Sequence, residues 1–335
     1  MLRILLIDRF VNPVWERKWL WFLYLSFWIV SWLFLENLET LQLLFLLFGL
    51  VVFTIPHGSS DAYLPAWILN PPWELRSAYW LIVFGFLWLA ALITVALGAL
   101  SINFSIALFT GVIIWHWGSM DALRLYPNRG PSWVIGSIGR GMLVFIAPLY
   151  FKPLETQEVI LSILQIEHSH ILATLYSFSK YLLYLAISLE VLSFLANKFI
   201  EGRGLPPTMA AHIFESMLLL LTFMWVSPML SITFYFLIIH AVRHMMRVAH
   251  CIPEERSNLL DNGGVMKTLP NLFQRTNLMT FLAGFALAIW FIWQLYTGSG
   301  FREATLACLL PLILLMFPHS MVSLLTDFNP KRLND

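Results

Sequence analysis

Long apolar runs separated by short polar breaks dominate this sequence. A helix needs roughly 20 apolar residues to cross a hydrocarbon core of about 30 Å, and many runs approach that length. The polar breaks include Pro71-Pro72, Gly202 to Pro207 and Pro253 to Asn277. At Ser227-Pro228 a turn between two spans and a kink in one helix fit the sequence equally well. We predict ten membrane-spanning helices, at residues 19–35, 41–55, 78–97, 102–118, 133–151, 171–196, 209–226, 229–248, 279–296 and 304–325.

Composition supports a membrane protein. Of 335 residues, 59% are hydrophobic and only 12% are charged, whereas soluble chains average about 25% charged residues. The fold class we predict is an all-α polytopic bundle, with residues 1–335 forming a single transmembrane domain. A net charge of +1 argues against nucleic acid as a partner, because such binding needs a concentrated cationic face. Cys251 and Cys308 are too few for a disulfide framework or a cysteine-based metal site.

The basic residues predict the orientation of the bundle. Lys and Arg in short loops stay cytoplasmic, and ten spans with both termini inside place most basic residues on one side. The apolar run from Trp19 to Leu35 is too long for a signal peptide and lacks a small-residue cleavage pattern, so we expect a retained first span. We therefore expect a multi-pass protein of the cell (inner) membrane. The residues assigned to the cytoplasmic side are Arg3 to Lys18, Arg76, Arg124, Arg129, Arg140, Lys198, Arg203, Arg243 to Arg275, Lys331 and Arg332.

Four of the nine histidines lie in compact polar motifs that border apolar runs. Ionisable groups at that depth are rare and functional by default. In the predicted topology these histidines lie near cytoplasmic span ends, hence at one depth. The motifs are Pro56-His57-Gly58-Ser59-Ser60-Asp61, Trp115-His116-Trp117-Gly118-Ser119-Met120-Asp121 and His240-Ala241-Val242-Arg243-His244.

The spacing within these motifs is typical of metal ligands. His240 and His244 are four residues apart, which stacks two imidazoles on one face of a helix. His57 and His116 are each followed by an acid, Asp61 or Asp121, which can hold the far N–H of a ligating imidazole. We therefore interpret each His-x-Gly-like turn plus Asp as a further ligand arm.

Several features of the motifs have simpler explanations. The histidines can be interfacial groups that bond loop carbonyls. The acids can be helix caps or partners of Arg124 and Arg243. Gly58 and Gly118 can allow close backbone approach beside a ligand or simply pack between helices.

The donor set favours iron. Four neutral imidazoles without a thiolate, leaving coordination positions open, suit a redox-active Fe(II) better than structural zinc. Such an ion can bind dioxygen, and an apolar pocket around it suits a lipid-like substrate. Residues that can line this site are Phe236, one helical turn before His240, with Trp115, Trp117 and His319; His212 is a weaker candidate.

Together these motifs resemble the membrane β-carotene 15,15′-dioxygenases, the Brp/Blh proteins. The resemblance spans roughly residues 50 to 325 and rests on the order and intervals of the three motifs, with Pro318-His319 similar to a further family element. It implies that His57, His116, His240 and His244 coordinate one Fe(2+), and that O₂ splits β-carotene at its central double bond into retinal. It also implies a functional link to a retinal-binding rhodopsin.

Three other classes remain open on the sequence. A di-iron membrane hydroxylase or other lipid oxygenase needs about eight histidines in several boxes, and only His240 to His244 resembles one. A haem or quinone protein can use His57 and His116 as axial ligands. A transporter is expected to show charged residues near mid-bilayer and broken helices in matching halves, and neither is evident in the sequence.

Overall fold

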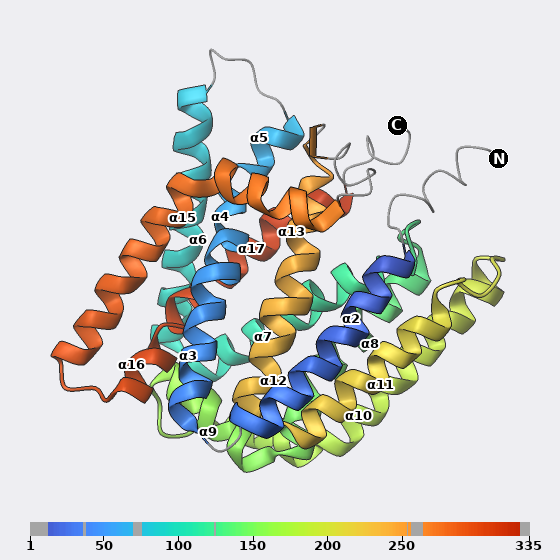
Figure 1. Cartoon of the computed structure of the whole chain (residues 1–335), viewed down its shortest axis with the longest axis horizontal. Helices are drawn as coiled ribbons and strands as arrows, with labels where there is room; N and C mark the ends of the chain where they lie inside the picture. Colours follow the sequence, from blue (N-terminus) through green and yellow to red (C-terminus); the bar gives the residue numbers. More distant parts are fainter. Residues whose placement is uncertain are drawn as a thin grey trace. The chain divides into compact units, whose positions relative to one another are not determined.

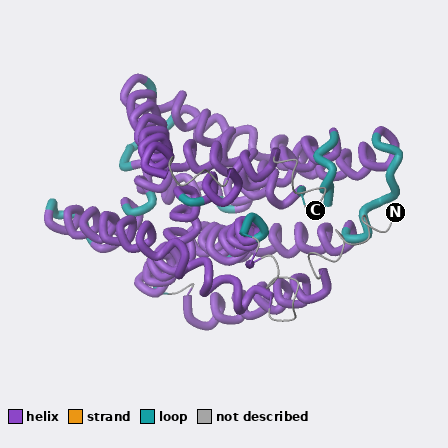
Figure 2. The backbone as a smooth tube through the Cα atoms, turned by 90° about the horizontal axis from the view of Figure 1, so that it is seen from above, coloured by secondary structure: helices purple, strands orange, loops and turns teal. Residues whose placement is uncertain are grey.

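The structure is a computed structural model that describes residues 13–35, 38–69, 76–123, 125–252, 254–255 and 264–328. These residues form helices and connecting loops, with no strand among them (Figure 2). The predicted all-α class is confirmed. Both termini, Arg124 and the break at Pro71-Pro72 lie outside the described residues.

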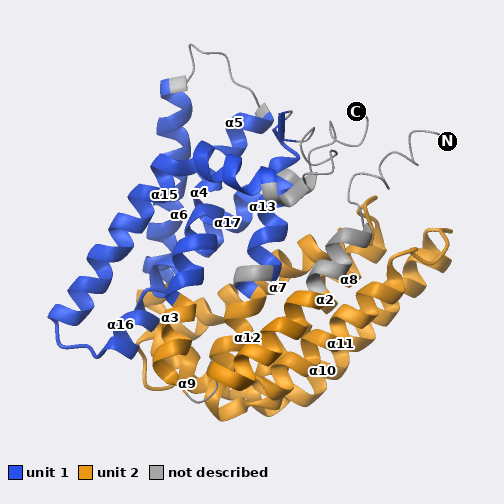
Figure 3. Ribbon diagram, in the orientation of Figure 1, with its two compact units in different colours: residues 1–12, 47–97, 236–335 blue, residues 13–46, 98–235 orange. Residues whose placement is uncertain are grey.

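The chain forms two compact units, each built from segments far apart in sequence (Figure 3). Within the described ranges, unit 1 takes its residues from 47–97 and 236–328. Unit 2 takes its residues from 13–46 and 98–235. The histidine motifs are therefore shared out, with residues 57, 240, 244 and 319 in unit 1 and residue 116 in unit 2.

Unit 1 groups helices from two separate stretches of the chain. Helix α4 packs against α15 and α13, and α17 packs against α5 and η3. The elements of unit 1 are η2 (Leu50–Thr54), α4 (Ile55–Ser59), η3 (Ser60–Ala62), α5 (Leu64–Leu69), most of α6 (Arg76–Leu100) and of η6 (Tyr235–His240), α13 (Ala241–Ala249), α15 (Gly264–Tyr296), α16 (Phe301–Ala307) and α17 (Leu310–Phe328).

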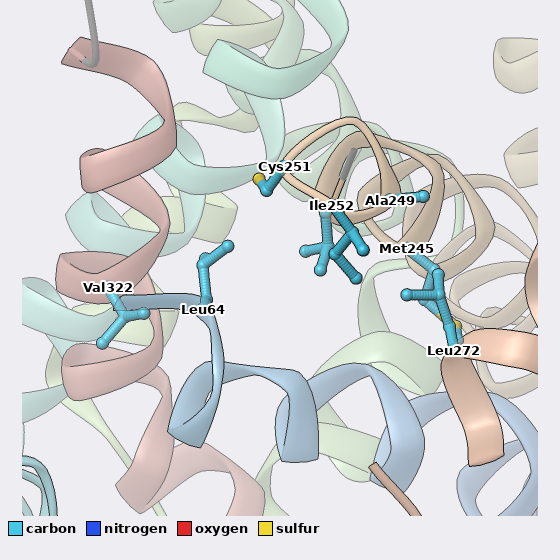
Figure 4. Packing of buried hydrophobic residues seen from close by; sticks show 8 residues of the cluster. Leu64, Met245, Ala249, Cys251, Ile252, Leu272 and Val322 are labelled. Atoms are coloured by element: carbon cyan, nitrogen blue, oxygen red, sulfur yellow. The ribbon is translucent and has the colours of Figure 1, made fainter. Parts of the chain in front are cut away.

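A buried apolar cluster joins four of these helices (Figure 4). Leu64 comes from α5, Met245 from α13, Leu272 from α15 and Val322 from α17, and all four side chains are buried. Burial of such apolar side chains stabilises their contact by roughly 1.5–3 kcal/mol each. The cluster thus fixes α13 and α17, the helices that carry His244 and His319.

In unit 2, α8 packs against three other helices, α7, α10 and α11 (Figure 1). The elements of unit 2 are α2 (Pro13–Val30), η1 (Ser31–Leu35), most of α3 (Glu39–Gly49), α7 (Ile102–Ala122), α8 (Pro131–Phe151), α9 (Pro153–Leu164), α10 (His170–Leu195), η5 (Ala196–Ile200), α11 (Met209–Trp225) and α12 (Pro228–Phe234). Ser101 and Ser169 cap α7 and α10, because their hydroxyls accept backbone N–H bonds from Phe104 and Leu172.

Glycines let α7 and α8 approach at backbone distance. A Cβ atom added to Gly118 would overlap the backbone of Ser137, and one added to Gly141 would overlap the backbone of Ile114. Small residues at helix contacts serve this purpose in membrane bundles. Gly118 therefore packs between helices, which is the second of the two roles the sequence left open. Gly58 has no atom within 4 Å of an added Cβ, so its position requires neither role.

We expect Gly118→Ala to destabilise the protein. The methyl group must push α8 away, and overpacking of this kind typically costs about 1–3 kcal/mol. Thermal unfolding of detergent-solubilised protein, followed by circular dichroism, should show a lower Tm. Gly111→Ala is the matched control on α7, because a Cβ there meets nothing within 4 Å. Equal Tm values for the two variants would contradict the close contact.

Seven helices among the described residues are long and apolar enough to cross a membrane, and two shorter ones are apolar. The predicted span at 229–248 is not among these nine, because His240, Arg243 and His244 interrupt its apolar run. The seven are Glu39–Ala62, Ser77–Leu100, Ile102–Ala122, Pro131–Phe151, His170–Ile200, Lys267–Tyr296 and Phe301–Leu324, and the shorter two are Trp21–Phe34 and Met209–Trp225.

Several helix boundaries differ from prediction. Helix α11 ends at Trp225, Val226 and Ser227 are extended, and α12 begins at Pro228, so the ambiguous break separates two helices. The polar stretch before residue 277 is already helical from Gly264, because that helix buries Leu272 in the unit 1 core. Helix α9, which was not predicted, follows α8 directly. Within the predicted span at 304–325, a short turn at Cys308 and Leu309 separates α16 from α17.

Candidate metal centre

His57 lies inside a helix rather than in the predicted turn. Helix α4 follows the π-helical turn η2, and helical structure continues to Ala62. Its serines are bonded within the helix: Ser59 Oγ donates to the Ile55 carbonyl at 2.7 Å, and Ser60 Oγ donates to the His57 carbonyl at 2.6 Å. These bonds satisfy the motif's hydroxyls locally, which leaves the His57 and Asp61 side chains to face other elements.

His240 and His244 come from consecutive helical segments. His240 ends the π-helical turn η6 and His244 lies in α13, with ring centroids 6.3 Å apart. The Phe236 ring stacks on His240 at 5.5 Å and an interplanar angle of 20°. Phe236 therefore shares a face with His240, as the sequence predicted. Wide π-helical turns are rare and often lie at functional sites, and here one precedes His57 and another contains His240.

The imidazoles of unit 1 gather around His57. Its ring centroid lies 5.3 Å from that of His240, 4.1 Å from His244 and 4.7 Å from His319. All four histidines are buried, and His57 is only 2% exposed. The ring centroids of His244 and His319 are 5.2 Å apart. Burial of four imidazoles together demands partners for their polar nitrogens.

Asp61 reaches across to α17 instead of supporting a histidine of its own helix. The Nδ1 atom of His319 lies 2.6 Å from Asp61 Oδ2, although the two residues are 258 positions apart. Because a carboxylate accepts hydrogen bonds, Nδ1 carries the proton of a neutral His319, and Nε2 then keeps its lone pair. This is the carboxylate–histidine arrangement that orients metal ligands.

The nitrogens of unit 1 fit one metal ion. His57, His240 and His319 each offer a ring nitrogen, and these atoms lie within 4.8 Å of one another. The Nε2 atoms of His57 and His319 are 2.9 Å apart. Two nitrogens that are each about 2.1 Å from one ion, at a right angle, are separated by about 3.0 Å. These buried histidines can therefore hold a metal ion.

His116 and Asp121 lie on α7 in unit 2, within the helix rather than in the predicted turn. Both side chains are buried. Asp121 Oδ2 accepts a 2.9 Å bond from Arg140 Nε and a longer one, at 3.5 Å, from the Tyr235 hydroxyl. Arg140 is thus a cation that pairs with Asp121, whereas Arg124 lies outside the described residues.

Arg140 is the centre of a charged network inside unit 2. Its side chain is 1% exposed, and it also donates to Glu215 Oε1 at 2.7 Å and to Ser216 Oγ at 2.8 Å. Ser216 in turn donates to Glu190 Oε2 at 3.1 Å. Arg140 lies in the middle of α8, inside the predicted span at 133–151, and not in a loop. Its three acid and hydroxyl partners offset the desolvation of the guanidinium.

The other candidate residues have separate surroundings. The indole of Trp115 packs edge-on against Trp133 at 5.2 Å, and that of Trp117 packs against Tyr235 at 5.7 Å. His212 Nε2 lies 3.1 Å from Glu190 Oε2, within the network of unit 2. We did not single out Glu190 or Glu215 in the sequence. Their signal was available, since both are acids inside predicted apolar spans.

The fold and the histidine cluster define a helical membrane protein with a buried site suited to a metal ion. A family model described as β-carotene 15,15′-dioxygenase matches residues 48–327. Because the match covers more than half of the chain, the protein belongs to this family, as the motif resemblance predicted. No curated protein and no solved structure matches the chain.

Proposed function

We propose that this protein cleaves β-carotene, or a closely related carotenoid, with O₂ at the central double bond to give two molecules of retinal. The observation that carries the proposal is the buried gathering of histidines in unit 1 of a chain from the β-carotene 15,15′-dioxygenase family. A retinal product would supply a retinal-binding rhodopsin, and the apolar helices suit a multi-pass protein of the cell (inner) membrane.

We assign Fe(2+) to the site, held by His57, His240 and His244 of unit 1 and by His116 of unit 2. Burial of the three unit 1 rings and their approach around His57 support their part of the assignment. Burial of His116 and the motif from Trp115 to Asp121 support the fourth ligand. When bound, iron supplies the binding and activation of O₂, which no side chain can provide.

The protein itself binds the substrate, orients it and excludes water from the site. A carotene has no ionisable group, so recognition must come from apolar and aromatic surfaces rather than from charges. Phe236, stacked on His240 and 6.5 Å from the ring of His57, is the aromatic side chain best placed to meet the polyene. Burial of the histidines excludes water from the place where the alkene must lie.

Expression in cells that already make β-carotene tests the reaction. We expect loss of the orange colour and appearance of retinal in the extract, because the substrate accumulates in the membrane where the enzyme resides. The measurement is chromatography of β-carotene and retinal against cells that carry the His57→Ala chain. Unchanged pigment in the presence of iron-loaded protein would overturn β-carotene as substrate.

Purified protein should contain about one iron per chain, which separates the proposal from a di-iron hydroxylase.

A further inference from the structure

The pairing of Asp61 with His319 is not explained by the four ligands assigned above. His319 comes from α17, the last described helix, and its Nδ1 lies 2.6 Å from Asp61 Oδ2. Both side chains are buried. A solvent-exposed pair of this kind would contribute little, but a buried carboxylate requires a strong compensating partner. The pair therefore fixes the plane and the tautomer of the His319 ring.

The fixed ring directs its other nitrogen toward the metal ligands. With the proton on Nδ1, the Nε2 atom of His319 is a lone-pair donor. That atom lies 2.9 Å from Nε2 of His57, and the nitrogens of His57, His240 and His319 fall within 4.8 Å of one another. The separation matches two ligands at a right angle on one ion, and His319 offers the same kind of donor as His57.

The apolar surroundings hold α17 in this position. Val322, one turn beyond His319, is buried in the cluster that includes Leu64 of α5 and Met245 of α13. Helix α17 also packs against η3, the segment that contains Asp61. The ring is therefore positioned from both sides, by packing of its helix and by the carboxylate bond.

We infer that His319, oriented by Asp61, is a further ligand of the metal in this site. The inference rests on the proposed function for the presence of iron. It adds a metal ligand from α17. It also makes Asp61 a positioning residue, which acts through His319 rather than through His57. The ordinary alternative is a plain imidazole–imidazole hydrogen bond in which His319 only supports His57.

Metal binding by the full-length protein distinguishes the two. His319→Gln removes the imidazole and leaves an uncharged amide side chain in its place. We expect X-ray absorption of the iron-loaded variant to show one imidazole fewer than in the wild type. The Kd for Fe(2+), measured by chelator competition, should rise by more than about 100-fold, beyond the range for loss of a supporting group. An unchanged imidazole count and Kd would overturn the inference.

Asp61→Asn provides a second, milder variant. The Asn carbonyl still accepts from Nδ1, so the fold is kept, but a neutral acceptor makes the imidazole a weaker ligand. We expect Fe(2+) affinity to fall about 10–100-fold with the imidazole count unchanged. Unchanged affinity would remove Asp61 from the assigned role. His250→Gln is the matched control in unit 1, because the His250 Nδ1 bonds to the Met246 carbonyl of its own helix at 2.8 Å, and the variant should bind iron as the wild type does.

The outcomes separate the inference from the function on which it rests. A wild-type protein that binds iron and cleaves β-carotene, with His319→Gln equal to it in ligand count and Kd, refutes only the role of His319. A wild-type protein that binds no metal refutes the proposed function and the inference together. Loss of one imidazole in His319→Gln but not in His250→Gln supports the inference even where neither variant is assayed for cleavage.

Discussion

Replacement of His57 by Ala should abolish iron retention and carotenoid cleavage together. His57 is the ring around which His240, His244 and His319 gather, so its loss removes a ligand that no neighbour can replace without moving a helix. Loss of a group that merely supports a ligand costs about 10–100-fold in metal affinity, and loss of the ligand itself should exceed that range. Iron content after purification and retinal formation are the two measurements.

Two controls accompany His57→Ala. His250→Ala removes an imidazole of the same unit whose Nδ1 bonds to the Met246 carbonyl, and it should keep iron and activity. The variant's fold can be checked with a thiol-reactive dye, because the thiols of Cys251 and Cys308 are buried in unit 1 and should stay unreactive in folded protein. A folded His57→Ala protein with full iron and full cleavage would refute the metal assignment.

Replacement of Arg140 by Met should destabilise the protein strongly. The change removes the cation between Asp121 and Glu215 and leaves two buried carboxylates with no opposite charge between them. Breaking a buried ion pair from one side typically costs about 3–5 kcal/mol. Circular dichroism of detergent-solubilised protein should show a large fall in Tm, or the variant should fail to accumulate.

Matched variants show whether charge burial is the cause. Arg203→Met removes an ion pair with Glu201 in which the Arg203 side chain is 44% exposed, and such pairs contribute only about 0–1 kcal/mol. Adding Asp121→Asn and Glu215→Gln to Arg140→Met should restore much of the lost stability, because a neutral network avoids unpaired charge. If Arg140→Met and Arg203→Met have the same Tm, the buried network does not stabilise the fold.

The covalent order of the residues was enough to predict much of the histidine site. His240 and His244 are close in sequence, so their proximity follows from helix geometry alone. Phe236 stacks on His240 for the same reason. Asp61, by contrast, was read as support for a metal-bound histidine in its own motif, but its observed partner lies on the last helix. Local spacing cannot reveal a bond between residues 258 positions apart.

The charged network of unit 2 is a second case in which local sequence spacing does not reveal the contacts. Arg140, Glu190 and Glu215 each stand in a different helix, and the sequence displays them only as isolated charges in apolar runs. Because a membrane interior contains no water, these charges must pair with one another, but the sequence does not indicate which helices pack together. Gly139 of α8 contributes to the contact between α8 and α10, because a Cβ atom at this position would lie 2.9 Å from the backbone nitrogen of Glu190.

By itself the sequence determined that the chain is helical and rich in membrane-length apolar segments, that its histidines form motifs with metal-ligand spacing, and that it resembles the β-carotene 15,15′-dioxygenases. These properties depend on composition and on spacings of three or four residues, which place side chains on the same face of a helix. Only the tertiary structure decided that Asp61 holds His319, that Arg140 is buried among acids, and that α17 brings a further imidazole to His57. Those contacts depend on which helices pack together, and that choice is made by the summed burial of side chains along the whole chain.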